Sequence, residues 1–131
     1  MQPIKVLIVD RETEFASIVA NRLGSWGYET TEAYSREEAL ATLAERSPDV
    51  VVVVFRDKDS WGLDLVRLIL DNDQPIRVIL LCGRGAAIAG MRGMQLGAAD
   101  CLSLPLELGA LIDSIRNATG SNASLPSDDA A

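Results

Sequence analysis

The stretch Pro48-Asp49-Val50-Val51-Val52-Val53-Val54-Phe55 decides the fold of this 131-residue chain. Five consecutive valines and a phenylalanine form an apolar run without the alternation of a half-exposed strand. β-Branched residues favour extended backbone, and a strand that is apolar on both faces has to be covered on both faces. The run therefore predicts a central strand of a parallel sheet with helices on either side.

Shorter strand-like segments lie on both sides of this run. We expect them at residues 6–9, 28–33, 76–81 and 101–104. Apolar residues recur at helical spacing between them and after the last one, which predicts five helices alternating with five strands. One of these helices begins with a capping box, Ser35-Arg36-Glu37-Glu38. Short connections between such elements favour right-handed crossovers, so we expect a doubly wound α/β fold.

The composition fits one domain and limits its partners. Hydrophobic residues make up 48% of the chain, enough for one core, and we assign residues 1–119 to this domain. Residues 120–131 are mainly small and polar, which predicts a disordered tail or linker. The net charge of −7 repels phosphate backbones, so we expect no direct binding to nucleic acid.

The sequence also argues against a membrane span, a zinc site and a catalytic triad with a histidine base. No apolar run approaches the roughly 20 residues that span a bilayer, and the start of the chain lacks a signal-peptide layout. We therefore expect a cytoplasmic protein without a membrane partner. Two cysteines and no histidine cannot complete a zinc site, and a triad with a histidine base is excluded.

In an open parallel sheet, functional residues gather where the strands end. Here the strand ends are Asp10, Val54-Phe55, Leu81-Cys82 and Leu104. Five further stretches carry a family likeness at matching spacing: Lys5-Val6-Leu7-Ile8-Val9-Asp10, Ser47-Pro48-Asp49-Val50-Val51, Trp61-Gly62-Leu63-Asp64-Leu65, Leu96-Gly97-Ala98-Ala99-Asp100 and Leu104-Pro105-Leu106. Together they resemble the receiver domain of bacterial two-component response regulators over about residues 4–118. The resemblance implies a flavodoxin-like (βα)5 sandwich with strand order 2-1-3-4-5.

The resemblance also implies five functional positions at the strand ends. In such domains two acids hold Mg²⁺, an aspartate accepts the phosphoryl group, and a hydroxyl and a lysine bind its oxygens. Matching the motifs places the two acids at Asp10 and Arg11, the acceptor at Val54, the hydroxyl at Cys82 and the lysine at Leu104. Only the first of these five positions keeps its functional side chain.

A valine cannot act as a nucleophile, and a leucine cannot bind a phosphoryl oxygen. An arginine next to Asp10 also opposes a divalent cation. We therefore expect no bound Mg²⁺, no other cofactor, no catalytic residue and no enzymatic activity. The chain is then a degenerate receiver domain, a module for protein–protein interaction in signalling that works without phosphorylation.

Three alternatives remain open at this stage. Asp57 lies three residues after Val54 and is a candidate displaced phosphoryl acceptor. Arg11 or Arg56 can pair with Asp10 or Asp57, so that an internal ion pair takes the place of the metal. A small-ligand or nucleotide binder on the same fold is disfavoured, because the loop after the first strand carries three acids and no glycine.

The resemblance further implies a signalling surface formed by the predicted helix at 86–96, the strand at 101–104 and the last helix. We place Met91, Met94, Cys101, Leu108 and Leu111 on this surface. Expected partners are another protein, a second copy of the chain, or an output domain that follows the C-terminal end.

Three other features have two readings each. Glycines in the stretch 83–94 indicate either a deformable partner surface or close helix packing. Trp61 either contacts a partner or packs locally. Cys82 and Cys101 occupy neighbouring predicted strands, and are either small core residues or a redox pair.

Overall fold

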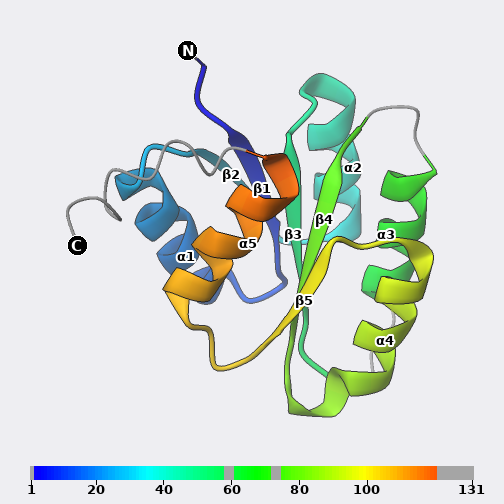
Figure 1. The fold of residues 1–131 in the computed structure, drawn as a ribbon. Helices are drawn as coiled ribbons and strands as arrows, with labels where there is room; N and C mark the ends of the chain where they lie inside the picture. Colours follow the sequence, from blue (N-terminus) through cyan, green and yellow to red (C-terminus); the bar gives the residue numbers. More distant parts are fainter. Residues whose placement is uncertain (1, 58–60, 72–74, 121–131) are drawn as a thin grey trace.

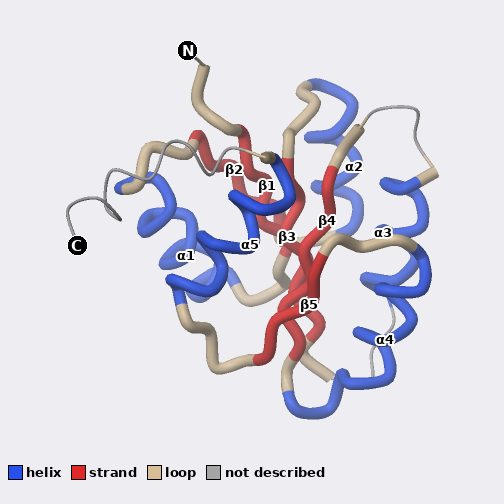
Figure 2. The backbone as a smooth tube through the Cα atoms, in the orientation of Figure 1, coloured by secondary structure: helices blue, strands red, loops and turns tan. Residues whose placement is uncertain are grey.

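A computed structural model describes residues 2–57, 61–71 and 75–120. It shows a five-stranded parallel sheet in the order β2-β1-β3-β4-β5, flanked by helices on both sides (Figures 1 and 2). The strands are β1 (Lys5–Val9), β2 (Glu29–Ala33), β3 (Val50–Phe55), β4 (Arg77–Cys82) and β5 (Asp100–Ser103). The helices are α1 (Thr13–Ser25), α2 (Arg36–Glu45), α3 (Trp61–Leu70), a short 3-10 turn η1 (Arg84–Ala86), α4 (Ala87–Leu96) and α5 (Leu108–Thr119).

Strand β3 lies at the centre of the sheet, as its run of valines predicts. It pairs with β1 through Val6↔Val50 to Val9↔Val53, and with β4 along its whole length. All six of its residues are buried. Helices α1 and α5 cover one face of the sheet, while α2, α3 and α4 cover the other (Figure 1). The doubly wound fold and its strand order are thereby confirmed.

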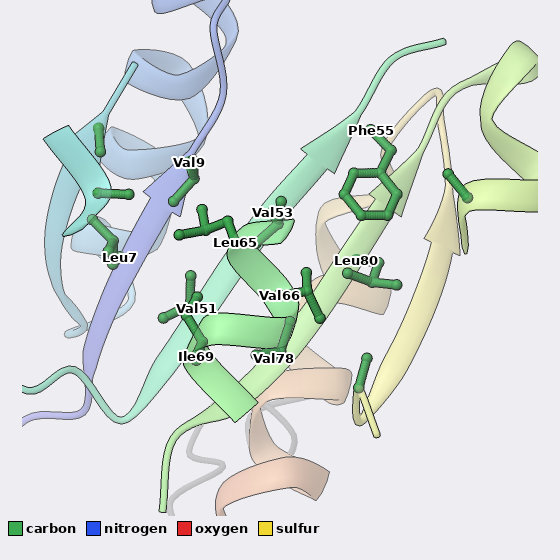
Figure 3. Close-up of a cluster of buried hydrophobic side chains, with 14 of the residues drawn as sticks. Leu7, Val9, Val51, Val53, Phe55, Leu65, Val66, Ile69, Val78 and Leu80 are labelled. Atoms are coloured by element: carbon green, nitrogen blue, oxygen red, sulfur yellow. The ribbon is translucent and has the colours of Figure 1, made fainter. Parts of the chain in front are cut away.

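The core has two layers, one on each face of the sheet. Under α3, the side chains of Leu65, Val66 and Ile69 lie over those of β3 and β4 (Figure 3). On the opposite face, alternate residues of the same strands contact α1 and α5. Because successive strand residues point to opposite faces, the valine run contributes to both layers at once.

Most local expectations agree with the structure. Strand β3 has the expected bounds, and the other strands begin or end one residue away from the expected positions. The Ser35 hydroxyl accepts a hydrogen bond from the Glu38 backbone N–H at 3.1 Å, which confirms the N-cap of α2. The predicted tail beyond Gly120 lies outside the described residues, as do parts of the expected loops at 58–60 and 72–74.

Helix α4 packs closely on the sheet through its glycines. A Cβ atom on Gly93 would lie 2.4 Å from Leu80 Cδ1, and one on Gly90 would lie 2.7 Å from Cys82 Sγ. Glycine is therefore needed here for close approach, which supports the packing interpretation of the stretch 83–94.

Candidate functional site

The five strands end at the carboxyl edge of the sheet, the lower edge in Figure 1. Asp10 follows β1, Arg56 follows β3, Cys82 ends β4 and Leu104 follows β5. Backbone hydrogen bonds hold the edge together: Gly83 N–H donates to Phe55 O at 2.7 Å, and Leu104 N–H donates to Cys82 O at 2.9 Å. The peptide bond between Leu104 and Pro105 is cis.

Asp10 is fully buried and bound by an arginine. Arg56 donates from Nε to Asp10 Oδ1 at 2.9 Å and from Nη2 to Oδ2 at 2.5 Å. Asp10 Oδ1 also accepts the backbone N–H of Glu12 at 3.1 Å. Such two-pronged contacts between a guanidinium and a carboxylate are among the stronger hydrogen-bonded ion pairs in proteins.

The surroundings of Arg56 favour its charged form. Its guanidinium carbon lies 4.9 Å from the centre of the Phe15 ring, and its Nε lies 3.9 Å from Glu12 Oε2. The hydrogen bond to Asp10 is the main cause that raises the pKa of Arg56, while partial burial acts in the opposite direction. A permanent positive charge therefore sits against Asp10.

A second, more exposed ion pair lies alongside. Arg11 Nη2 and Asp57 Oδ2 are 3.3 Å apart. Like the pair of Asp10 and Arg56, it joins residues 46 positions apart and links the loop after β1 to the loop after β3. The expected internal pairing is therefore present twice. Arg56, rather than Arg11, is the cation bound to Asp10.

The other positions implied by the resemblance are apolar or sulfur-containing. Val54 is only 3% exposed and belongs to the core layer under α1 and α5. The pairing of Val9 with Val53 places Val54 next to Asp10 across the sheet. Leu104 is half-buried against the same layer. The acceptor and lysine positions thus extend the hydrophobic core to the edge of the sheet.

Cys82 and Cys101 lie side by side, with 2.9 Å between their sulfur atoms. Both are free thiols, and Cys82 is buried while Cys101 is half-buried. Burial and, to a smaller degree, the contact with Cys101 raise the pKa of the Cys82 thiol to about 12. Cys82 is therefore protonated at neutral pH.

The expected signalling surface is only partly where the sequence places it. Met91 and Met94 are exposed on α4, as is Ile88. Cys101 and Leu108 are half-buried. The assignment of Leu111 to this surface is wrong, because Leu111 has no exposed area and belongs to the core under α5.

Trp61 begins α3 and is partly buried against the core layer on that face. This position agrees with the local-packing interpretation.

Sequence reasoning named Arg56 only as one of several pairing candidates and did not name Glu12 or Phe15 as its neighbours. A signal was present: an arginine directly after the central strand reaches the carboxyl edge, where an acid ends the neighbouring strand. Phe15, in the first turn of α1, carried no comparable signal.

Within the described ranges, no cluster of three or more metal-ligating side chains occurs. None of the helices described is long and apolar enough to cross a membrane.

The fold defines the class: a flavodoxin-like domain with five parallel strands in the order 2-1-3-4-5. Residues 6–116 match the family described as the response regulator receiver domain, and the chain belongs to this family. A crystal structure of a response regulator receiver domain protein from Clostridium thermocellum superposes with a TM-score of 0.82 at 28% identity, covering 92% of this chain and 97% of that one.

Two curated relatives show how the chain compares with longer proteins. The transcriptional regulatory protein TrcR of Mycobacterium tuberculosis is 29% identical over 87% of this chain and 44% of its own length. The phosphate regulon transcriptional regulatory protein PhoB of Pseudomonas aeruginosa is 28% identical over 88% of this chain and 52% of its own length. The chain thus spans about half the length of these relatives.

Proposed function

We propose that this receiver domain signals without phosphorylation and serves as a protein-interaction module. One observation carries the proposal: the guanidinium of Arg56 engages both carboxylate oxygens of the buried Asp10. A receiver domain that transfers phosphate needs this carboxylate for a divalent cation, and here a side chain of the same chain takes the cation's place.

The donor set does not fit Mg²⁺. This ion requires oxygen ligands in near-octahedral geometry. The two oxygens of Asp10 are bound by Arg56, and the adjacent acidic position carries the positively charged Arg11. Bringing a divalent cation here means displacing one arginine and approaching another, so we propose that the domain binds no Mg²⁺ and has no catalytic residue.

Phosphoryl acceptance is disfavoured at both candidate positions. Val54 presents a buried hydrocarbon. Asp57 lies beyond the end of β3, its side chain is 58% exposed, and it forms an ion pair with Arg11. These features support the phosphorylation-independent function over a displaced acceptor at Asp57.

Intact mass measurement tests this proposal. The chain is incubated with acetyl phosphate and Mg²⁺, with an Asp57→Asn variant treated in parallel. We expect no stable phosphate on either protein. An added phosphate on the wild type that disappears in Asp57→Asn would establish the displaced acceptor and overturn the proposal.

The interaction surface that we propose is the α4 surface, defined as Ile88, Met91 and Met94. These three large apolar side chains are 69%, 60% and 40% exposed. Methionine adapts well to partner surfaces because its side chain is unbranched and flexible. We propose a protein partner, a second copy of this chain or a following output domain as its contact, in the cytoplasm. Pull-down of a partner protein tests the assignment of the α4 surface. The Met91→Glu variant is compared with Arg46→Glu, a control substitution at another exposed site.

A further inference from the structure

Cys82 and Cys101 are brought together by the sheet. They lie on the adjacent parallel strands β4 and β5, and the register Leu80↔Cys101 and Cys82↔Ser103 makes them diagonal neighbours. Both belong to the same core layer, on the face covered by α4. Their sulfur atoms are 2.9 Å apart, closer than the about 3.5–4.0 Å at which carbon atoms make optimal contact.

Helix α4 leaves room for the two sulfur atoms at Gly90. A Cβ atom there would lie 2.7 Å from Cys82 Sγ and 3.0 Å from Cys101 Sγ. The helix backbone therefore lies directly over the thiol pair, without a side chain between them. Any change in the bonding of the two sulfur atoms acts directly on the surface on which α4 packs.

The thiol pair also borders a cavity. This cavity of about 440 Å³ is lined by both cysteines together with Arg84, Ser103 and Leu104, among others. Arg84 is exposed, and Cys101 is the more accessible of the two cysteines. The positive charge of Arg84 favours an anionic reagent, and Cys101 offers it a first point of attack.

We propose that Cys82 and Cys101 form a reversible redox pair, a covalent modification site that closes to a disulfide between β4 and β5 when a small anionic disulfide of the glutathione type enters the cavity. A disulfide requires an S–S distance of about 2.05 Å, so the 2.9 Å gap closes by about 0.9 Å. Disulfides in reducing compartments are mostly transient and redox-sensing, which fits a pair that is reduced in the resting state.

The exchange is balanced in two steps. The Cys101 thiolate attacks one sulfur of the small disulfide, which breaks the S–S bond of the reagent and releases one thiolate. Cys82 then loses its proton and attacks the Cys101 sulfur, which breaks the mixed disulfide and releases the second thiolate. The two released thiolates take up the two cysteine protons. Two electrons pass from the protein to the reagent.

The two cysteines have different roles in this exchange. Burial holds Cys82 protonated, so it resolves the mixed disulfide slowly and does not make the first attack. A mixed disulfide at Cys101 is therefore the expected intermediate. The proposal does not rest on the ion pair of Asp10 and Arg56, because the described hydrogen bonds of that pair involve neither sulfur.

The test treats the full chain with oxidised glutathione and measures intact mass and free thiols. We expect the wild type to lose two hydrogen atoms and both free thiols without forming a disulfide between chains, and a reductant to restore both thiols. The Cys82→Ser variant is expected to stop at the mixed disulfide with glutathione. The folded Cys101→Ser variant is expected not to react with oxidised glutathione.

Folding and accessibility are controlled separately. Circular dichroism before oxidation establishes that each variant is folded, and the urea-unfolded wild type shows that both thiols react once exposed. Three results would overturn the proposal: a folded wild type that keeps both thiols, one that keeps a glutathione adduct, or one that forms a disulfide between two chains. Hydrogen exchange at α4 is expected to change on oxidation of the wild type alone.

Discussion

Arg56 and Asp10 share an ion pair with unequal access to water: Asp10 has no exposed side-chain area, whereas 22% of the Arg56 side chain is exposed. Removing Arg56 leaves the buried Asp10 carboxylate in a poorly solvated place without its guanidinium partner. An arginine that loses its partner can turn toward solvent. The two halves of the pair should therefore respond differently to substitution.

We expect Arg56→Ala to lower the free energy of unfolding by about 3–5 kcal/mol, because it leaves the buried charge of Asp10 uncompensated. Asp10→Ala should cost less, about 1–3 kcal/mol, since Arg56 keeps Glu12 nearby and can reach water. Urea unfolding measures both values. An unchanged stability in Asp10→Ala would show that the pair does not contribute.

Magnesium provides a second prediction on the same pair. The melting temperature of the wild type should not respond to MgCl₂ beyond the effect of NaCl at equal ionic strength. Arg56→Ala exposes the oxygens of Asp10 to cations, and Mg²⁺ at tenfold its dissociation constant should stabilise this variant by about 1.4 kcal/mol. Arg46→Ala, which removes an exposed partner of Glu29, is the matched control and should not gain a response. A magnesium response in the wild type would contradict the proposed function.

The packing of α4 predicts opposite effects for two glycines. Gly93→Ala should destabilise the domain by about 1–3 kcal/mol, because the new methyl group meets the fully buried Leu80. Gly24→Ala in α1 has no atom within 4 Å of the new Cβ and should stabilise by up to about 1 kcal/mol through helix propensity. Thermal unfolding of both variants measures the difference. Equal effects would show that α4 does not pack as closely as described.

The corrected position of Leu111 leads to a third contrast. Leu111→Ala should cost about 2–5 kcal/mol, because it removes a fully buried side chain. Met91→Ala should change stability by less than about 0.5 kcal/mol, since Met91 is exposed. Urea unfolding compares the two, and a large loss in Met91→Ala would place this residue in the core.

The raised pKa of Cys82 predicts a loss of stability in alkaline solution. The unfolded chain ionises this thiol near its ordinary pKa of 9.0, whereas burial raises the pKa of the thiol in the folded chain to about 12. The unfolded state then binds fewer protons, so the contribution of Cys82 is complete below pH 9 and is lost as the pH rises toward 12. The free energies of unfolding of the wild type and of Cys82→Ala, measured in urea across this pH range, should converge. A constant difference would contradict the shift.

Much of the fold could be predicted from the sequence because the strongest signals are local. The valine run at 50–55 requires apolar cover on both faces, and this alone indicates a parallel sheet with two helical layers. Leu111 is misplaced because the resemblance assigns it to the signalling surface, although Leu108, Leu111, Ile112 and Ile115 share one apolar face of α5 that helical periodicity places toward the sheet.

The site could be predicted in part. The sequence predicts that Asp10 and Val54 belong to the site, because both lie at the ends of predicted strands. The choice of Arg56 over Arg11 as the partner of Asp10 depends on side-chain directions in two loops, which no periodicity encodes. The contact between Cys82 and Cys101 depends on the register of β4 and β5, and sequence alone only makes the two strands neighbours.

The two ion pairs join the same two loops across 46 positions of the chain. Under the proposed function, the arginines of the domain serve as its built-in counter-ions at this edge, in place of a bound metal or phosphate. The remaining means of control that we propose are then the redox state of the thiol pair under α4, the number of copies in the cell, and competition for the α4 surface.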